Sequence, residues 1–198
     1  MFENTKCRCP WVDISKPDYV AYHDDEWGVP VYNDQKLFEC FTLESAQAGL
    51  SWYTILKRRD GYKKAFNEFV IDEVALFDDA KIDELVNNSD IVRHKGKISA
   101  TINNAKCIQL IQEEFESFSD YLWAFVEHKT IVNNWKNKDD YPVTTKASDA
   151  LSKDLKKRGF KFVGSTICYA FMQACGMVND HSVDCYKRSQ IINKYKQA

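Results

Sequence analysis

Helical periodicity is the feature of this sequence that most constrains its fold. Apolar residues recur at spacings of three and four over most of the chain, which predicts amphipathic helices. The expected helices cover residues 34–48, 61–69, 82–88, 97–114, 119–127, 145–158, 165–175 and 181–194. Alternating strand patterns are nearly absent, and the longest irregular connection spans residues 129–144. The sequence therefore predicts an all-α protein.

The charge balance and the cysteines limit the partners and the compartment. The 29 acidic and 27 basic residues nearly cancel, so any nucleic-acid surface must be local. Seven irregularly spaced cysteines make a poor disulfide framework, which favours a reducing compartment. The longest apolar stretch, around 166–178, is shorter than the roughly 20 residues of a membrane span, and no signal-like region begins the sequence. We expect a cytoplasmic monomer with no membrane partner.

A glutamate on an apolar helix face is the most informative single residue. Asp34 is expected to cap a helix that runs to about Ala48. At about 100° per residue, the apolar stripe of this helix contains Glu44 as well as Leu37 and Phe41. An ionised carboxylate there is costly unless something pairs with it. Either Glu44 reaches water or an arginine at the helix edge, or it lines a cleft for a cationic or donor-rich ligand.

Aromatic residues are concentrated near the N-terminus among polar neighbours. Most aromatic side chains belong to cores, and that interpretation is open here. Rings beside a carboxylate, however, form a slot that suits a flat, electron-poor base. The residues concerned are Trp11, Tyr19, Tyr22, Trp27 and Trp52.

A metal site is a further possibility. His181 and Cys185 are four residues apart in an expected helix, which would place both on one face at a spacing suited to two metal ligands. Cys9 and His23 could complete a tetrahedral Cys2His2 site, although their separation matches no standard finger spacing. Spacing alone leaves both metal binding and chance coincidence open.

A short basic turn at residues 91–97, Ile-Val-Arg-His-Lys-Gly-Lys, separates two helical patterns. Such a turn holds a phosphate through basic side chains, here Arg93, Lys95 and Lys97, and through backbone N–H groups near Gly96 at the start of the second helix. A solvated turn without a ligand is the alternative. Further basic clusters occur at 57–59 and 156–158.

Several motifs occur together in one known family. They include Cys-Pro-Trp-Val at 9–12, Tyr-His-Asp-Asp-Glu-Trp-Gly-Val-Pro at 22–30 and the stretch from Leu43 to Trp52. Segments 91–98, 147–153, 156–164 and 175–181 extend the match. In this combination the chain resembles the bacterial DNA-3-methyladenine glycosylase I family over nearly its whole length.

The resemblance implies a helix-hairpin-helix DNA glycosylase fold. It implies one domain over residues 1–198, with two helical lobes around a cleft, formed by 1–60 plus 160–198 and by 61–159. It also implies one structural zinc ion joining the N- and C-terminal segments. The implied ligands are Cys9, His23, His181 and Cys185, with Cys7 as an extra neighbour. The hairpin departs from the superfamily pattern because it carries only one glycine, Gly96.

The implied activity is excision of 3-methyladenine from double-stranded alkylated DNA. The methylated nucleoside is already cationic, so its base leaves without a general acid. We expect Tyr22 and Trp52 to hold the flipped base, within the aromatic pocket described above. Glu44 is the expected catalytic carboxylate, accepting hydrogen bonds from the base and supplying negative charge. Leu50 is expected to fill the gap left in the DNA.

Two other functions fit parts of the pattern. A zinc-stabilised, non-catalytic module that binds damaged or single-stranded DNA would share the basic turn and the aromatics, but would not need Glu44 on an apolar stripe. A zinc hydrolase would need an open coordination position, which four protein ligands would not leave.

Overall fold

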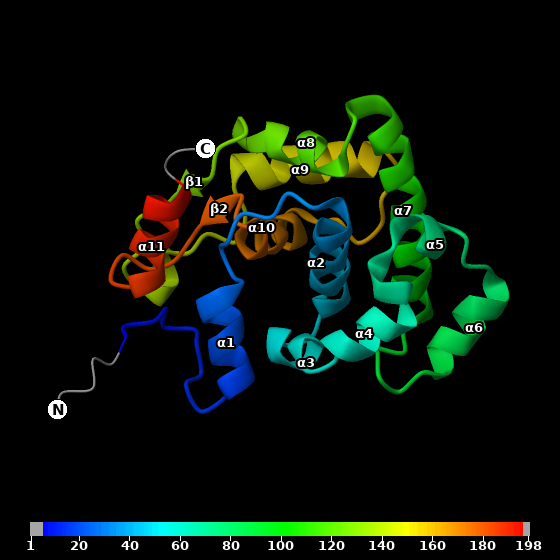
Figure 1. Cartoon of the computed structure of the whole chain (residues 1–198), viewed down its shortest axis with the longest axis horizontal. Helices are drawn as coiled ribbons and strands as arrows, with labels where there is room; N and C mark the ends of the chain where they lie inside the picture. The colour runs from blue at the N-terminus through cyan, green and yellow to red at the C-terminus, as the bar shows by residue number, and fades with distance from the viewer. Residues whose placement is uncertain (1–5, 196–198) are drawn as a thin grey trace.

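The computed structural model describes residues 6–195 and confirms the all-α prediction (Figure 1). The ends of the predicted domain, residues 1–5 and 196–198, lie outside the described residues. The α-helices are α1 (Pro17–Asp25), α2 (Asp34–Gln47), α3 (Trp52–Leu56), α4 (Arg59–Ala65), α5 (Ile71–Ala75), α6 (Asp79–Asn87), α7 (Lys95–Phe115), α8 (Phe118–Trp123), α9 (Lys146–Lys157), α10 (Ser165–Ala174) and α11 (Tyr186–Tyr195). Short 3₁₀ turns are η1 (Asn67–Phe69), η2 (Ala124–Val126) and η3 (Lys138–Asp140). Two-residue strands β1 (Ile131–Val132) and β2 (Val178–Asn179) pair in parallel.

The apolar α10 lies at the centre of the molecule (Figure 1). It packs on α2 and on α9, while α5, α6 and α7 form the right-hand side of the view. One large hydrophobic core runs through these elements, and it includes residues from both of the predicted lobes. A smaller core surrounds Cys9, Tyr22 and Cys185 beside α1. No helix within residues 6–195 combines the length and the apolar character needed to cross a membrane.

The start of α2 differs from the prediction. Asn33, not Asp34, is the N-cap, because its side chain accepts a hydrogen bond from the Lys36 N–H at 2.9 Å. The Asp34 carboxylate instead accepts hydrogen bonds from the N–H groups of Phe118 and Ser119, both at 2.9 Å. Asp34 therefore satisfies unpaired donors at the start of α8 and ties that helix to α2.

The predicted helix at 181–194 begins later than expected, so the helical argument for His181 and Cys185 was wrong. Both residues precede α11. The backbone N–H groups there have non-helical acceptors: that of Val183 donates to the Trp135 carbonyl, and that of Cys185 to the Ser182 carbonyl. These bonds hold the segment as a turn.

A buried carboxylate anchors the irregular connection 129–144. Asp180, directly after β2, accepts hydrogen bonds from Asn133 Nδ2 at 2.7 Å and Trp135 Nε1 at 2.9 Å. It also accepts from the Tyr169 hydroxyl and from Gln173 Nε2 on α10. Charge-assisted bonds of this kind are strong when desolvated. The long loop is therefore held against α10, where it forms part of the site described next.

Candidate functional site

The structure brings the predicted base-pocket residues together around one open pocket of about 340 Å³. The N-terminal segment, α1, the turn after α1, α2 and α3 all contribute to it. The predicted residues that line it are Trp11, Tyr19, Tyr22, Trp27, Glu44 and Trp52. These side chains therefore form a single site.

Aromatic rings support one another around this pocket. The ring centroids of Tyr22 and Trp52 lie 5.2 Å apart at an interplanar angle of 43°. The Trp11 ring lies 5.3 Å from Tyr19 and 4.9 Å from Trp27. Each distance is in the range that aromatic pairs prefer. The rings thus hold a fixed arrangement in which a flat ligand could stack.

Polar atoms in this pocket lack partners within residues 6–195. The indole N–H groups of Trp11 and Trp52 are buried and unpaired. Glu44 is only 4% exposed, and no described side chain or N–H group donates a hydrogen bond to its carboxylate. Buried polar groups in folded proteins are normally hydrogen-bonded. Unpaired donors and an unpaired acceptor in one pocket therefore indicate a ligand site.

Glu44 lies among buried apolar side chains of α2, as the helical stripe predicted. Leu37 and Phe41, two turns and one turn earlier, are fully buried. Burial raises the pKa of the Glu44 carboxyl to about 8. The free protein therefore holds this group largely protonated at neutral pH, whereas a cation beside it would favour the ionised form. The interpretation of Glu44 as an exposed residue at the helix edge does not fit its low exposure.

The sequence analysis did not identify the other lining residues: Pro10, Gln47, Tyr141, Pro142, Ala170 and Gln173. Gln47 follows Glu44 by three residues, so helical spacing could have placed it on the same face. Tyr141 and Pro142 belong to the connection 129–144. Its length was the available signal, because long irregular loops often carry functional residues.

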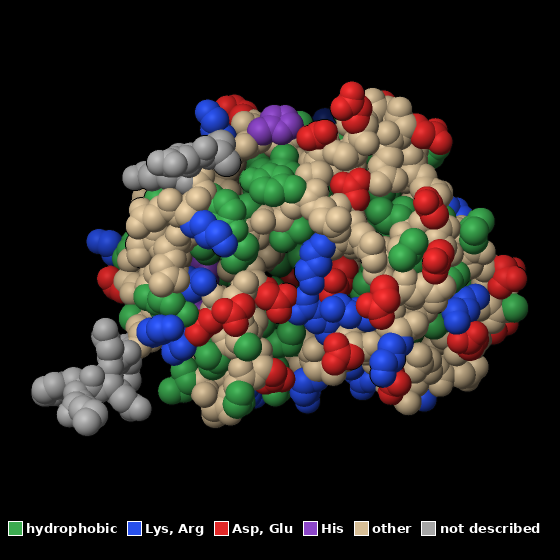
Figure 2. Space-filling view, in the orientation of Figure 1, with side chains coloured by type: hydrophobic (Ala, Val, Ile, Leu, Met, Phe, Trp, Pro, Cys, Tyr) green, Lys and Arg blue, Asp and Glu red, His purple; other side chains and the backbone are tan. Residues whose placement is uncertain are grey.

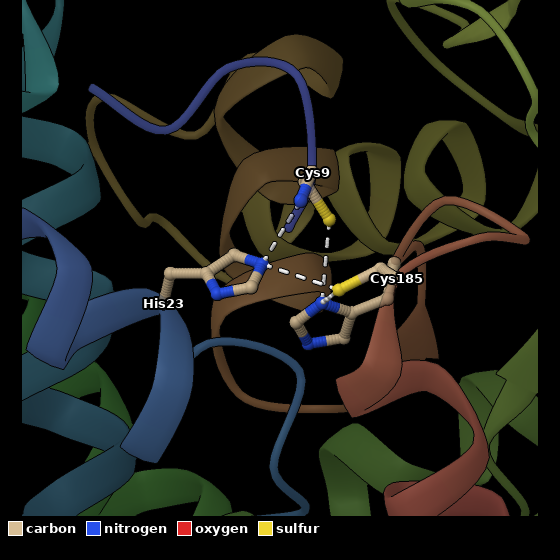
Figure 3. A group of neighbouring side chains, drawn as sticks. Cys9, His23 and Cys185 are labelled. Carbon is tan, nitrogen blue, oxygen red and sulfur yellow. Dashed lines mark hydrogen bonds between the residues drawn. The ribbon is translucent and has the colours of Figure 1, made fainter. Parts of the chain in front are cut away.

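Cys9, His23, His181 and Cys185 form a buried group that could hold a metal ion. Figure 3 shows Cys9, His23 and Cys185 converging from the N-terminal segment, α1 and the turn before α11. Cys9 Sγ lies 3.4 Å from His181 Nδ1, and Cys185 Sγ lies 3.5 Å from His23 Nε2 and from His181 Nδ1. These distances match the edges of about 3.6 Å expected for tetrahedral coordination with metal–sulfur bonds of about 2.3 Å and metal–nitrogen bonds of about 2.0 Å. Cys7 is exposed and lies outside the group.

The surroundings of the group orient its histidines. His23 Nδ1 lies 2.8 Å from the Asp24 carboxylate, and His181 Nε2 lies 2.9 Å from the Trp27 carbonyl oxygen. With an N–H at each of these positions, the nitrogens that face the group carry lone pairs. A hydrogen bond between the two thiols lowers the pKa of Cys185 and raises that of Cys9, so Cys185 forms a metal-binding thiolate more readily than Cys9 does. The donor set and its orientation therefore fit a metal ion.

Two tryptophans connect the Cys2His2 group to the pocket. The Trp11 ring lies 5.3 Å from His23, and the Trp27 ring lies 4.7 Å from His181, both edge-on. Both tryptophans also line the pocket. A displacement of the histidines would therefore move the pocket wall.

The predicted hairpin lies between α6 and α7, and its basic residues have different surroundings. Arg93, Lys95 and Gly96 are exposed. Lys97 is half-buried, and its Nζ donates hydrogen bonds of 2.8 and 2.7 Å to two backbone carbonyls at the end of α2. Gly61 of α4 packs closely against the residue before the hairpin, because a Cβ there would lie 2.5 Å from the backbone oxygen of Asp90.

Leu50 occupies the exposed turn between α2 and α3. Its side chain is 40% exposed, and Gly49 before it has a φ of +79°, a conformation that favours glycine. Trp52 of the pocket follows two residues later. The turn therefore presents an apolar side chain to solvent close to the pocket, as a residue that fills a gap in DNA requires.

The arginines of the other basic clusters are engaged within the protein. Arg59 donates to both oxygens of Glu26 and to Glu39, which ties α4 to α2 and to the turn after α1. Arg158 pairs with Glu114 and Asp154. Figure 2 shows acidic and basic side chains interspersed over the face in view. Neither sign of charge dominates this face, in keeping with the near balance of acidic and basic residues.

Comparisons with known proteins find relatives over most of the chain. A family model described as methyladenine glycosylase matches residues 11–188. DNA-3-methyladenine glycosylase 1 of Escherichia coli is 51% identical over 178 residues, covering 90% of this chain and 95% of the relative. A crystal structure of a 3-methyladenine DNA glycosylase I has a TM-score of 0.88 at 49% identity and covers 91% of this chain and 98% of that chain. A Staphylococcus aureus structure, described as the structural basis of 3-methyladenine recognition, has a TM-score of 0.85 at 38% identity and covers 87% and 92%.

The raised pKa of Glu44 predicts a pH-dependent effect of Glu44→Gln on stability. The folded-state pKa of about 8 exceeds the ordinary value of 4.5, so the folded protein binds the extra proton between these values. Wild-type stability is therefore lost as pH rises through this window, by at most roughly 1.4 kcal/mol per pH unit, while the Gln variant has no proton to lose. Denaturant unfolding should show near-equal stabilities at pH 4.5 and a clear advantage of the variant at pH 8. The exposed control Glu113→Gln should show no such trend; a pH-independent difference for Glu44→Gln would mean that the carboxylate is solvated.

Proposed function

Because this chain belongs to the methyladenine glycosylase family and removes 3-methyladenine from DNA in base-excision repair, we propose that the pocket around Glu44 holds the flipped base during cleavage. The observation that carries the proposal is the buried Glu44 carboxylate without a hydrogen-bond partner, beside two unpaired indole N–H groups. A cationic base with an amino group would supply both a charge and donors to that carboxylate.

The chemistry follows from the charge of the methylated nucleotide. Cleavage of the bond between the sugar carbon and the base leaves the electron pair on the base, which departs neutral. The positive charge moves to the sugar, and water adds to the sugar carbon and releases a proton to solvent. The products are the free base and an abasic site. No proton has to reach the leaving base, so the site needs no general acid.

Glu44 acts through its charge in this scheme. The base cation favours loss of the Glu44 proton, because a nearby opposite charge lowers a carboxyl pKa. The carboxylate then accepts hydrogen bonds from the base, and its negative charge stabilises the positive charge that develops on the sugar. The low exposure of Glu44 among apolar side chains of α2 strengthens both interactions.

The rings hold and orient the base. Base–aromatic stacking contributes about 1–3 kcal/mol per ring, here from Tyr22 and Trp52, and offsets part of the cost of flipping the nucleotide. Burial and the neighbouring Glu44 raise the pKa of the Tyr19 and Tyr22 phenols, so both remain hydrogen-bond donors. Trp11 and Trp27 complete the aromatic wall.

Release of the free base from methylated duplex DNA tests this proposal. Wild-type protein should release 3-methyladenine, detected by chromatography of the small-molecule fraction. Glu44→Gln replaces an acceptor by a donor and should slow release roughly ten- to a hundredfold, because a charge-assisted hydrogen bond is lost. Glu113→Gln should retain the wild-type rate. Full activity of Glu44→Gln would mean that the base binds elsewhere than in this pocket. DNA binding by the wild-type protein without any base release would favour the non-catalytic binding module.

We infer that the Cys2His2 group holds a structural zinc ion. Two thiolates and two imidazoles at tetrahedral spacing are the donor set that zinc prefers, and four protein ligands leave no position for water or substrate. The ligands come from segments near both ends of the described chain. The ion would pin the N-terminal segment and the turn before α11 together and so support Trp11 and Trp27.

Removal of one ligand should cost both the metal and stability. Structural zinc contributes on the order of 10 kcal/mol of binding free energy in small peptides, part of which would stabilise this fold. Cys185→Ala should therefore contain less than equimolar zinc by mass spectrometry and melt at a lower temperature. Cys7→Ala removes an exposed thiol outside the group and should change neither quantity. A Cys185→Ala protein of unchanged stability but no activity would instead indicate a catalytic metal.

Contact with double-stranded DNA is proposed to involve Arg93, Lys95 and Gly96 of the hairpin, with Leu50 in the gap left by the flipped base. The exposed side chains of Arg93 and Lys95 suit a phosphate, as do the N–H groups of Lys95 and Gly96, whereas the Lys97 N–H is capped by His94. Lys95→Gln should lower the slope of log affinity against log salt by about one, the value of one lost phosphate contact. Lys106→Gln, at an exposed position three turns further along α7, should leave the slope unchanged. If Lys95→Gln also leaves it unchanged, the phosphate surface lies elsewhere.

We also propose that the protein works as a cytoplasmic monomer. All seven cysteines are free thiols, which suits a reducing compartment. Residues of one chain line the pocket around Glu44, so catalysis there does not require a second copy.

A further inference from the structure

Lys97 differs from Lys95, the other lysine of the hairpin, because its ammonium group points into the protein. Its Nζ donates to the carbonyl oxygens of Ala46 at 2.8 Å and Ala48 at 2.7 Å. Burial lowers the pKa of Lys97, whereas Lys95, two residues earlier on the same helix, is exposed. A phosphate could bind Lys97 only after both hydrogen bonds were broken.

The two carbonyls lie at the C-terminal end of α2, between Glu44 and the Leu50 turn. The last carbonyls of an α-helix have no partner within the helix, and a cation there also offsets the helix dipole. Ala48 is the C-cap of α2, and the exposed turn with Gly49 and Leu50 follows directly. Glu44 lies one turn before it on the same helix. One side chain from the first turn of α7 therefore holds the end of the helix that carries both Glu44 and the Leu50 turn.

We propose that Lys97 is a positioning residue that couples the hairpin on the DNA backbone to the base pocket. When Arg93 and Lys95 seat the hairpin on phosphates, Lys97 sets the position of the α2 end, so that Leu50 enters the duplex while Glu44 faces the base. The proposal rests on the proposed function of the Glu44 pocket. It assigns to Lys97 a role in alignment in place of the phosphate contact that its position in the sequence suggested.

Three lysine-to-methionine variants in α7, at Lys95, Lys97 and Lys106, test this role, because each of them loses one positive charge. Lys97→Met keeps an unbranched stem but cannot donate to the carbonyls. It should slow single-turnover release of 3-methyladenine at saturating protein by roughly 10- to 100-fold, the scale expected for a small misplacement of reacting groups. Its salt slope for DNA binding should equal that of wild type, and its affinity for free 3-methyladenine, measured by tryptophan fluorescence, should change little.

The comparison variants separate alignment from phosphate binding. Lys95→Met should lower the salt slope, and Lys106→Met should change neither the slope nor the rate. Retention of the wild-type rate by Lys97→Met overturns the proposal, as does a drop in salt slope equal to that of Lys95→Met. If wild-type protein itself releases no base, the proposed function fails rather than the role of Lys97.

Amine labelling of the unmodified protein gives a second test that does not depend on folding of a variant. Lys97 should resist acetylation both with and without duplex DNA, because its ammonium is already bonded to the α2 carbonyls. Lys95 should react readily in the free protein and become protected by DNA. Rapid labelling of Lys97 in the free protein, followed by protection with DNA, would make it a phosphate contact and overturn the proposal.

Discussion

The desolvation of a single carboxylate is the constraint on which the site depends. Glu44 lies in the apolar stripe of α2 with no donor from the described residues, and burial holds its pKa near 8. A fold tolerates such a group only if surrounding packing offsets its cost. Here α2 packs on the central α10, and both belong to the main core. The stability of that core therefore offsets the cost of keeping the Glu44 carboxyl among apolar side chains.

The walls of the pocket depend on contacts between distant parts of the chain. Trp11 and Trp27 pack edge-on against the histidines of the Cys2His2 group, so the same rings contact that group and line the pocket around Glu44. On the other side, Asp180 gathers donors from α10 and from the connection 129–144, which brings Tyr141 to the pocket. No single helix or loop therefore forms the pocket. The contacts at the Cys2His2 group and at Asp180 hold the loops and helix ends that line it in place.

Charged residues near the pocket serve mainly to join elements. Arg59 ties α4 to α2 and to the turn after α1 through Glu39, which is buried, and Glu26, which is partly exposed. Lys97 joins α7 to the end of α2. Such partly buried, charge-assisted bonds resist displacement far more than exposed pairs do. Arg93 and Lys95 of the hairpin therefore differ from Arg59 and Arg158, because they are exposed while both of those arginines are paired within the protein.

The sequence by itself determined the helices and the presence of a glutamate, Glu44, on the apolar face of one of them. Periodicity is a local property, so the all-α class and the position of Glu44 on a buried face could be predicted from spacing alone. The resemblance of its motifs to one family indicated the activity and the four potential metal ligands.

Only the tertiary structure decided which residues far apart in the sequence contact one another. His181 and Cys185 meet Cys9 and His23 from a turn and not from a helix, since Val183 between them donates its backbone N–H to the distant Trp135 carbonyl. Asp34 binds the start of α8, Lys97 binds the end of α2, and Tyr141 reaches the pocket from a long loop. Each of these depends on which distant donor or acceptor lies nearby, and only the folded chain brings those partners together.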